Sequence, residues 1–129
     1  MNKKGFTLVE LLGVITVLAV IGLITMPIVN KTIKDSKQRA YNGQVEEIIK
    51  AAEDYSADNI SKIPDGESNC PSTSPLLNLY IDTLKEEGYI PENAKDPRTN
   101  TLLTGGVIIT YDCEYKSYIY TYDPNLVKP

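Results

Sequence analysis

An unbroken run of apolar residues dominates the first part of the chain. Over residues 6–29 the only charged residue is Glu10, and residues 11–29 carry no charge. As a helix, this run would be about 36 Å long, enough to cross the roughly 30 Å hydrocarbon core of a bilayer. A buried core helix is the alternative, but a chain of this size rarely surrounds a helix that is apolar on every face. The pattern therefore predicts a membrane-spanning helix over residues 6–29.

A helical periodicity continues after the apolar run. Apolar residues recur every three or four positions between Ile33 and Tyr55 and form one stripe along a helix. Charged residues, among them Glu46, Lys50 and Glu53, occupy other faces. We expect one helix over residues 6–58, about 80 Å long, with an amphipathic second half over residues 30–59. The stripe of that second half needs a partner in the rest of the chain.

Residues 60–129 are expected to form a small head. Residues 63–71 are rich in turn formers and predict a loop. Ser74 is a good N-cap and Pro75 a good first helical residue, and apolar residues follow at helical spacing as far as Leu84. We therefore expect a short helix that stops at Gly88. Residues 92–106 are expected to be mostly loop.

Val, Ile, Thr and Tyr dominate residues 107–111 and 117–122, which predict two strands joined by a hairpin connection. A third strand is expected near residues 101–104. Alternation places Tyr118, Tyr120 and Tyr122 on one face, where we expect packing, with a sugar-binding patch as the alternative. The expected fold class is α+β, a long helix packed on a small antiparallel sheet.

Composition disfavours an enzyme. The chain has 129 residues, enough for one domain. It contains no His, which excludes His-based catalytic triads and His-ligated metal sites, and its two Cys are too few for a four-thiolate metal site. The sequence has no long Gly-rich phosphate loop. We expect neither catalytic activity nor a cofactor.

Glu10 is physically unusual in the apolar run. A carboxylate costs about 2.5–3.5 kcal/mol at the centre of a membrane helix, and no basic residue lies within the run to offset it. Cleavage of the peptide bond between Gly5 and Phe6 would create a cationic amine on Phe6. That amine would lie one turn from Glu10 of its own chain, or directly beside Glu10 of an adjacent copy displaced by about a turn.

These residues carry a resemblance to a known family. The segment resembles the processing site of type IV pilins and pseudopilins, with the residues Lys3-Lys4-Gly5-Phe6-Thr7-Leu8-Val9-Glu10. The resemblance implies that a prepilin peptidase removes a leader, residues 1–5, that Phe6 is then N-methylated, and that Glu10 acts in assembly. Pro27 lies where many members carry a helix-kinking proline, which implies local unwinding between Gly22 and Pro27 on assembly, with a tolerated kink of a membrane helix as the alternative. The fold implied is a minimal pilin-like one.

The resemblance implies a structural subunit of a type IV pilus-like filament that polymerises through its N-terminal helix. Its implied partners are copies of itself or other pilin subunits, the prepilin peptidase and methyltransferase, membrane lipids and the pilus assembly platform. Pilus, competence filament and type II secretion pseudopilus stay open. The alternative is a monomeric single-pass membrane protein with a small extracellular ligand-binding head.

Two features of the sequence predict opposite orientations of the chain in the membrane. Counting Lys and Arg places the flank after the span on the cytoplasmic side, since it contains Lys31, Lys34, Lys37 and Arg39. The resemblance requires the opposite, because the peptidase must reach Gly5 from the cytoplasm. We expect a single-pass protein of the cell membrane with its N-terminus cytoplasmic and its C-terminus outside, and then a cell-surface filament.

Cys70 and Cys113 lie in the expected outside part, where disulfides persist. A bond between them would close a loop of about 44 residues and stabilise the fold by about 4 kcal/mol in the chain-entropy model. Two free thiols are the alternative.

Charge is unevenly distributed. Residues 40–129 contain seven Lys and Arg against 15 Asp and Glu, whereas the flank after the span is basic. We expect that flank to contact lipid head groups. DNA binding through the filament is the alternative, which the acidic head disfavours. Four carboxylates could gather near the strand ends, but they lack the spacing of a calcium loop and are expected to be a solvated surface, with a metal site as the alternative. They are Asp96, Asp112, Glu114 and Asp123.

Overall fold

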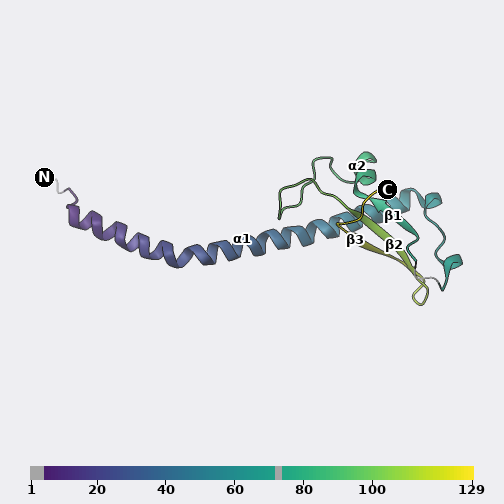
Figure 1. The fold of residues 1–129 in the computed structure, drawn as a ribbon, viewed down its shortest axis with the longest axis horizontal. Helices are drawn as coiled ribbons and strands as arrows, with labels where there is room; N and C mark the ends of the chain where they lie inside the picture. Colours follow the sequence, from purple (N-terminus) through teal and green to yellow (C-terminus); the bar gives the residue numbers. More distant parts are fainter. Residues whose placement is uncertain (1–4, 72–73) are drawn as a thin grey trace. The chain divides into compact units, whose positions relative to one another are not determined.

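The computed structural model describes residues 5–71 and 74–129 and confirms the α+β class (Figure 1). The chain divides into two compact units, one up to Lys37 and one from Gln38 to Pro129. The elements in chain order are α1 (Leu8–Asp58), 3₁₀ turns at Ile60–Lys62 and Glu67–Asn69, β1 (Leu77–Tyr80), α2 (Ile81–Glu86), β2 (Gly106–Asp112) and β3 (Ser117–Asp123).

The described part of the first unit is almost entirely helical. Every large apolar side chain from Leu8 to Val29 is at least 50% exposed. The most apolar 18-residue window of α1 has a mean hydropathy of 2.6 and no buried residue, so by length and composition it can cross a membrane. A helix that is apolar on every face requires lipid or other helices around it.

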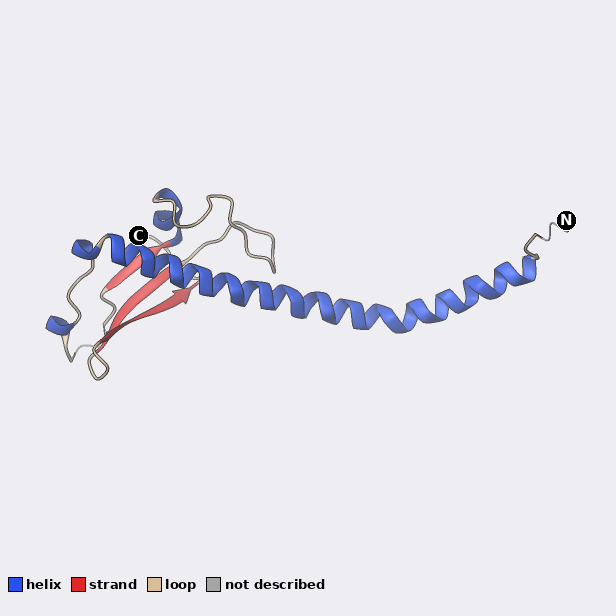
Figure 2. Ribbon diagram, turned by 180° about the vertical axis from the view of Figure 1, so that it is seen from behind, coloured by secondary structure: helices blue, strands red, loops and turns tan. Residues whose placement is uncertain are grey.

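The second unit packs the C-terminal half of α1 against a three-stranded antiparallel sheet in the order β1-β2-β3 (Figure 2). Val107 of β2 pairs with Leu79 of β1 and with Tyr122 of β3. Ile48 and Ala52 of α1 are at most 2% exposed and share one core with Leu79 and Val107. The amphipathic stripe thus has the partner that it requires.

The first strand corrects one sequence-based expectation. The pattern predicts a helix from Pro75, but Leu77–Tyr80 form β1 and the helix α2 begins only at Ile81. Leu77 fits both the expected helical stripe and an alternating pattern with Leu79, and pairing with β2 buries Leu79 to 4% exposure. The expected stop at Gly88 is close to the end of α2, and Gly88 adopts a positive φ of 82° that glycine accommodates freely.

The expectation of a strand near residues 101–104 is also wrong. That segment makes only an isolated bridge between Lys95 and Leu102, because β1 already occupies the place beside β2. The loop is instead fixed by Arg98, whose guanidinium lies 3.4 Å from the ring centroid of Tyr41. Its Nη2 also donates a hydrogen bond of 2.9 Å to Asp96. A charged side chain therefore joins this loop to α1.

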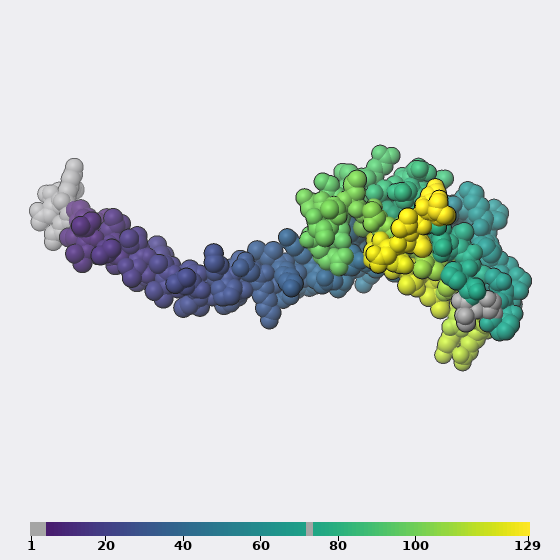
Figure 3. Space-filling model, in the orientation of Figure 1, coloured from purple at the N-terminus to yellow at the C-terminus, as the bar shows by residue number. Residues whose placement is uncertain are grey.

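The residues that follow β3 lie on the surface of the second unit, in yellow in Figure 3. A Cβ on Gly106 would come within 2.7 Å of Cδ2 of Leu126. The absence of a side chain at Gly106 therefore allows the C-terminal segment to lie close to the sheet.

Candidate processing and assembly site

The first turn of α1 carries the residues of the expected processing and assembly site. Oγ1 of Thr7 accepts a hydrogen bond of 3.2 Å from the Glu10 N–H, and Oε2 of Glu10 accepts one of 3.0 Å from the Thr7 N–H. This reciprocal pair is a capping box, which satisfies N–H groups at the helix N-terminus. Glu10 also lies at the positive end of the helix dipole.

The capping box was missed in the sequence, although the spacing Thr-x-x-Glu before an apolar run is its usual signature. It shows that the Glu10 carboxylate already has a polar contact within its own chain. From the described residues, Oε1 of Glu10 accepts no hydrogen bond. One carboxylate oxygen thus caps the helix, while the other is available to a cation.

The bond expected to be cut is accessible. Phe6 is 91% exposed and Gly5 is also exposed. Apart from Gly5, the expected leader lies outside the described residues. A hollow of about 590 Å³ extends along α1 from this point. Its lining is apolar except for Glu10 and consists of Phe6, Glu10, Gly13, Val14, Val17 and Leu18. Such a surface suits the side of another apolar helix.

Pro27 lies inside α1, and the ribbon of the apolar part is bent (Figure 1). Proline has no N–H to donate and so weakens the helix locally. The chain is nevertheless helical from Gly22 to Pro27.

Threonine hydroxyls in the apolar part of α1 donate to carbonyls of the preceding turn, as Thr16 does to Leu12 at 2.7 Å. Within hydrocarbon, such bonds satisfy hydroxyl groups that would otherwise be unpaired.

Known protein families and proteins match this N-terminal motif and most of the chain. The family model described as "Prokaryotic N-terminal methylation motif" matches residues 1–26. "Competence protein ComGC" of Bacillus subtilis is 31% identical over 109 residues, which cover 84% of this chain and 96% of that protein. "ComG operon protein 3 homolog" of Bacillus licheniformis is 31% identical over 97 residues, or 75% and 84% of the two chains.

The chain belongs to the ComGC family of type IV pilin-like proteins. No solved structure matches it. ComGC-family proteins are structural proteins and not enzymes, as the composition of this chain predicts.

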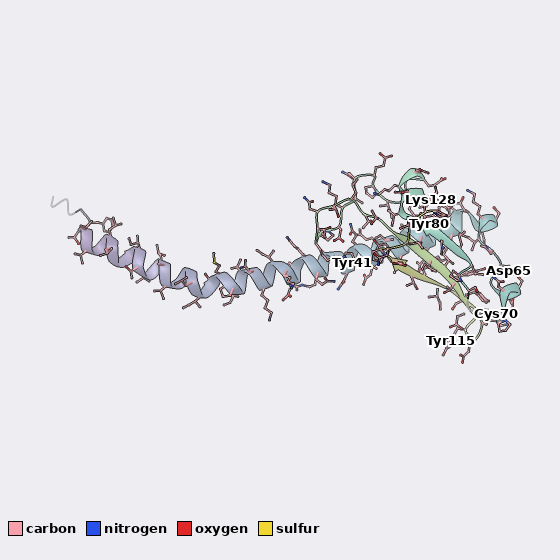
Figure 4. All side chains as sticks on the ribbon, in the orientation of Figure 1. Tyr41, Asp65, Cys70, Tyr80, Tyr115 and Lys128 are labelled. Atoms are coloured by element: carbon pink, nitrogen blue, oxygen red, sulfur yellow. A yellow bond between two sulfur atoms is a disulfide. The ribbon has the colours of Figure 1, made fainter. Side chains whose placement is uncertain are left out.

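A disulfide lies in the head of this ComGC-family chain. Cys70 and Cys113 are bonded, with their Cα atoms 6.0 Å apart. The bond ties the loop after the second 3₁₀ turn to the connection between β2 and β3. Cys70 and Tyr115 lie at one end of the second unit and Tyr41 at the other (Figure 4). The disulfide, and not the pair of free thiols, is what the structure contains.

Three of the four carboxylates considered as metal ligands, those of Asp96, Asp112 and Asp123, serve local turns. Oδ1 of Asp112 accepts hydrogen bonds from the N–H groups of Glu114 (2.8 Å) and Tyr115, and Oδ1 of Asp123 accepts one from the Asn125 N–H (2.9 Å). Asp96 pairs with the Arg98 guanidinium, which lowers the pKa of the Asp96 carboxyl mainly by hydrogen bonding. Among the described residues, no three metal-ligating side chains come together.

Two of the three tyrosines of β3 pack against the core, while Tyr118 packs edge-on against the Tyr111 ring. Tyr120 and Tyr122 contact the core, and Tyr122 donates a hydrogen bond of 2.7 Å to the Thr104 carbonyl. Burial raises the pKa of Tyr122 to about 12. Elsewhere in the head, the Tyr89 hydroxyl donates to Asp58 at 2.6 Å, and this hydrogen bond raises the pKa of Tyr89 to about 12. These phenols tie loops to α1 and to the sheet.

Proposed function

We propose that this chain is the structural subunit of a competence filament. It is made as a membrane-anchored precursor, cut between Gly5 and Phe6, methylated on the Phe6 amine, and polymerised through the apolar part of α1. The name of its Bacillus subtilis relative, "Competence protein ComGC", favours a competence system over a type II secretion pseudopilus or another pilus. The family membership of the chain supports a filament subunit.

One observation carries the proposal: a single carboxylate, Glu10, stands at the start of an exposed apolar helix with one oxygen still free of hydrogen bonds from described residues. The Phe6 amine of a neighbouring copy supplies the missing cation. Because the pairing removes an unpaired charge from an apolar environment, it stabilises one helix register over others. The exposed apolar side chains of residues 8–29 then pack between copies.

The precursor is placed with its N-terminus in the cytoplasm and its head outside. Its parts are the leader (residues 1–5), the membrane and assembly helix (6–29), the amphipathic continuation (30–59) and the head (60–129). The peptidase and methyltransferase, the assembly platform and lipids are its partners before polymerisation, and other pilin subunits after it. The acidic head is not assigned a role in binding DNA.

The test is the identity of the mature N-terminus. Filaments sheared from the native host should contain a chain that begins at Phe6 and carries the mass of one additional methyl group, by N-terminal sequencing and intact-mass measurement. A chain that keeps Met1, found only as a monomer in the membrane, would support the single-pass ligand-binding protein instead.

A further inference from the structure

A groove runs along one side of the head, between α1 and β3. It has a volume of about 230 Å³ and is lined by α1, by the turn that follows it and by two tyrosines of β3. The lining residues are Glu53, Ser56, Ala57, Ile60, Ile63, Tyr118 and Tyr120. Among the described strands, β3 is an edge of the sheet. The groove therefore lies where the sheet ends.

The groove exposes apolar surface that the described part of the head leaves open. Ile60 is 77% exposed and Tyr118 is 39% exposed. Glu53 is the only charged residue of the lining, and within the described residues its carboxylate forms no ion pair. A matching partner would combine an apolar side chain with a nearby cation.

The chain itself contains such a segment. Ile33 is 48% exposed and is closely flanked by Lys31 and Lys34. Neither of these lysines forms an ion pair with a described residue. The basic segment, residues 31–39, carries four Lys and Arg against one Asp, whereas residues 40–129 carry an excess of eight acidic residues. Charge therefore favours contact between the basic segment of one copy and the head of another.

We propose that, in the filament, the groove of each subunit takes Ile33 from α1 of another copy, with Lys31 of that copy beside Glu53. The proposal rests on the proposed filament function and names one of its interfaces. Helices that share one direction would place Ile33 opposite Ala57 and Lys31 within a turn of Glu53. The offset is about 24 residues, or about 36 Å, so this neighbour differs from the one that contributes the Phe6 amine.

The two surfaces in this contact are different parts of the chain. An interface between unlike surfaces repeats from copy to copy and produces an open polymer unless it closes into a ring, whereas a contact of one surface with itself stops at a dimer. The groove contact therefore suits a filament and gives it a direction.

Disulfide cross-linking tests the contact in assembled filaments. A double variant with Ile33→Cys and Ala57→Cys should give, on oxidation, a ladder of dimers, trimers and higher multimers that reduction abolishes. Each single variant should give none. Pairing Ile33→Cys with Val127→Cys is the control, because Val127 is 80% exposed but does not line the groove. Filaments of the double variant without a ladder, or dimers from Ile33→Cys alone, would overturn the contact.

A charge exchange tests the same contact without new cysteines. Glu53→Lys should lower the sheared filament yield about tenfold or more, because it places like charges together at an interface. Adding Lys31→Glu should restore most of the yield. Glu86→Lys makes the same change in net charge on an exposed site of α2 and should assemble normally. Equal yields from Glu53→Lys and Glu86→Lys would refute the inference.

The groove contact and the proposed filament function can be disproved separately. If the unaltered chain forms filaments but neither experiment responds, only the groove contact is wrong. If the unaltered chain forms no filament in its host, the proposed function is wrong. A loss of membrane insertion in Lys31→Glu, before any assembly, would assign the basic segment to lipid head groups instead.

Discussion

The backbone N–H of Thr7 donates a hydrogen bond of 3.0 Å to the carboxylate of Glu10. Glu10 thus has a role in its own chain, as a helix cap, which is separate from the proposed role between chains. The two roles use different properties of the side chain. Capping needs an acceptor oxygen, whereas pairing with an amine needs a negative charge.

Glu10→Gln separates these roles, because glutamine keeps an acceptor oxygen and loses the charge. We expect the variant precursor to insert and to be cut normally, while the filament yield falls strongly. Immunoblots of membrane and sheared fractions measure both. Thr7→Val is the matched control, since it removes the cap at a cost of about 1 kcal/mol but keeps the charge, and it should still assemble. Normal filaments from Glu10→Gln would remove the proposed charge pairing.

Gly5→Leu should stop processing. A bulky side chain next to the expected scissile bond hinders entry into a peptidase site, so uncut precursor should accumulate in the membrane. The uncut precursor is heavier than the mature chain by the mass of the five leader residues, and intact-mass measurement detects this difference. Gly13→Leu is the control, because a Cβ at Gly13 meets nothing within 4 Å in the described chain. Cleavage of Gly5→Leu at the normal rate would contradict the assigned cut.

Replacing both Cys70 and Cys113 by Ser should destabilise the head. The bond spans a sequence separation of 43 residues, and the chain-entropy model gives about 4 kcal/mol for a loop of this size. Thermal unfolding of the detergent-solubilised full chain, followed by near-ultraviolet circular dichroism, measures the loss. Reduction of the unaltered chain should reproduce it. An unchanged midpoint under oxidising conditions would show that the bond adds no stability.

The Asp96–Arg98 pair predicts a loss of stability in acid. The guanidinium donates to the carboxylate and lowers the pKa of Asp96 below its unfolded value of about 3.9. Such a group stabilises the fold above the unfolded pKa, and this contribution is lost as the pH falls through the folded pKa. Asp96→Asn should therefore lower the unfolding midpoint at neutral pH and have progressively less effect below about pH 4. A difference that does not change with pH would assign the effect to packing.

The long helix and the hairpin could be predicted from the sequence because each has one dominant period. The helix expected over residues 6–58 is α1, Leu8–Asp58, and the run expected at residues 107–111 lies within β2. β1 could not be predicted in this way, because Leu77 fits two periods and only pairing with Ile109 and Val107 decides between them. Long-range pairing of this kind leaves no mark in the local pattern.

The candidate assembly site could be predicted in part. The unusual position of Glu10 shows in the sequence, and so does the spacing of its capping box with Thr7. The proposed cation, the Phe6 amine, is also expected from the sequence, as the product of cleavage after Gly5. The contact of Arg98 with the Tyr41 ring is hidden, since more than 50 residues of chain separate the two side chains.

The bond between Cys70 and Cys113 also reports whether the head has reached an oxidising compartment. Cytosolic thiols stay reduced, whereas disulfides persist in oxidising compartments. A chain whose head has not yet crossed the membrane would carry two sulfhydryls that a maleimide can label, and an exported chain would carry none. The two sulfur atoms therefore allow the side of the membrane to be read from a single chemical modification, without any engineered tag.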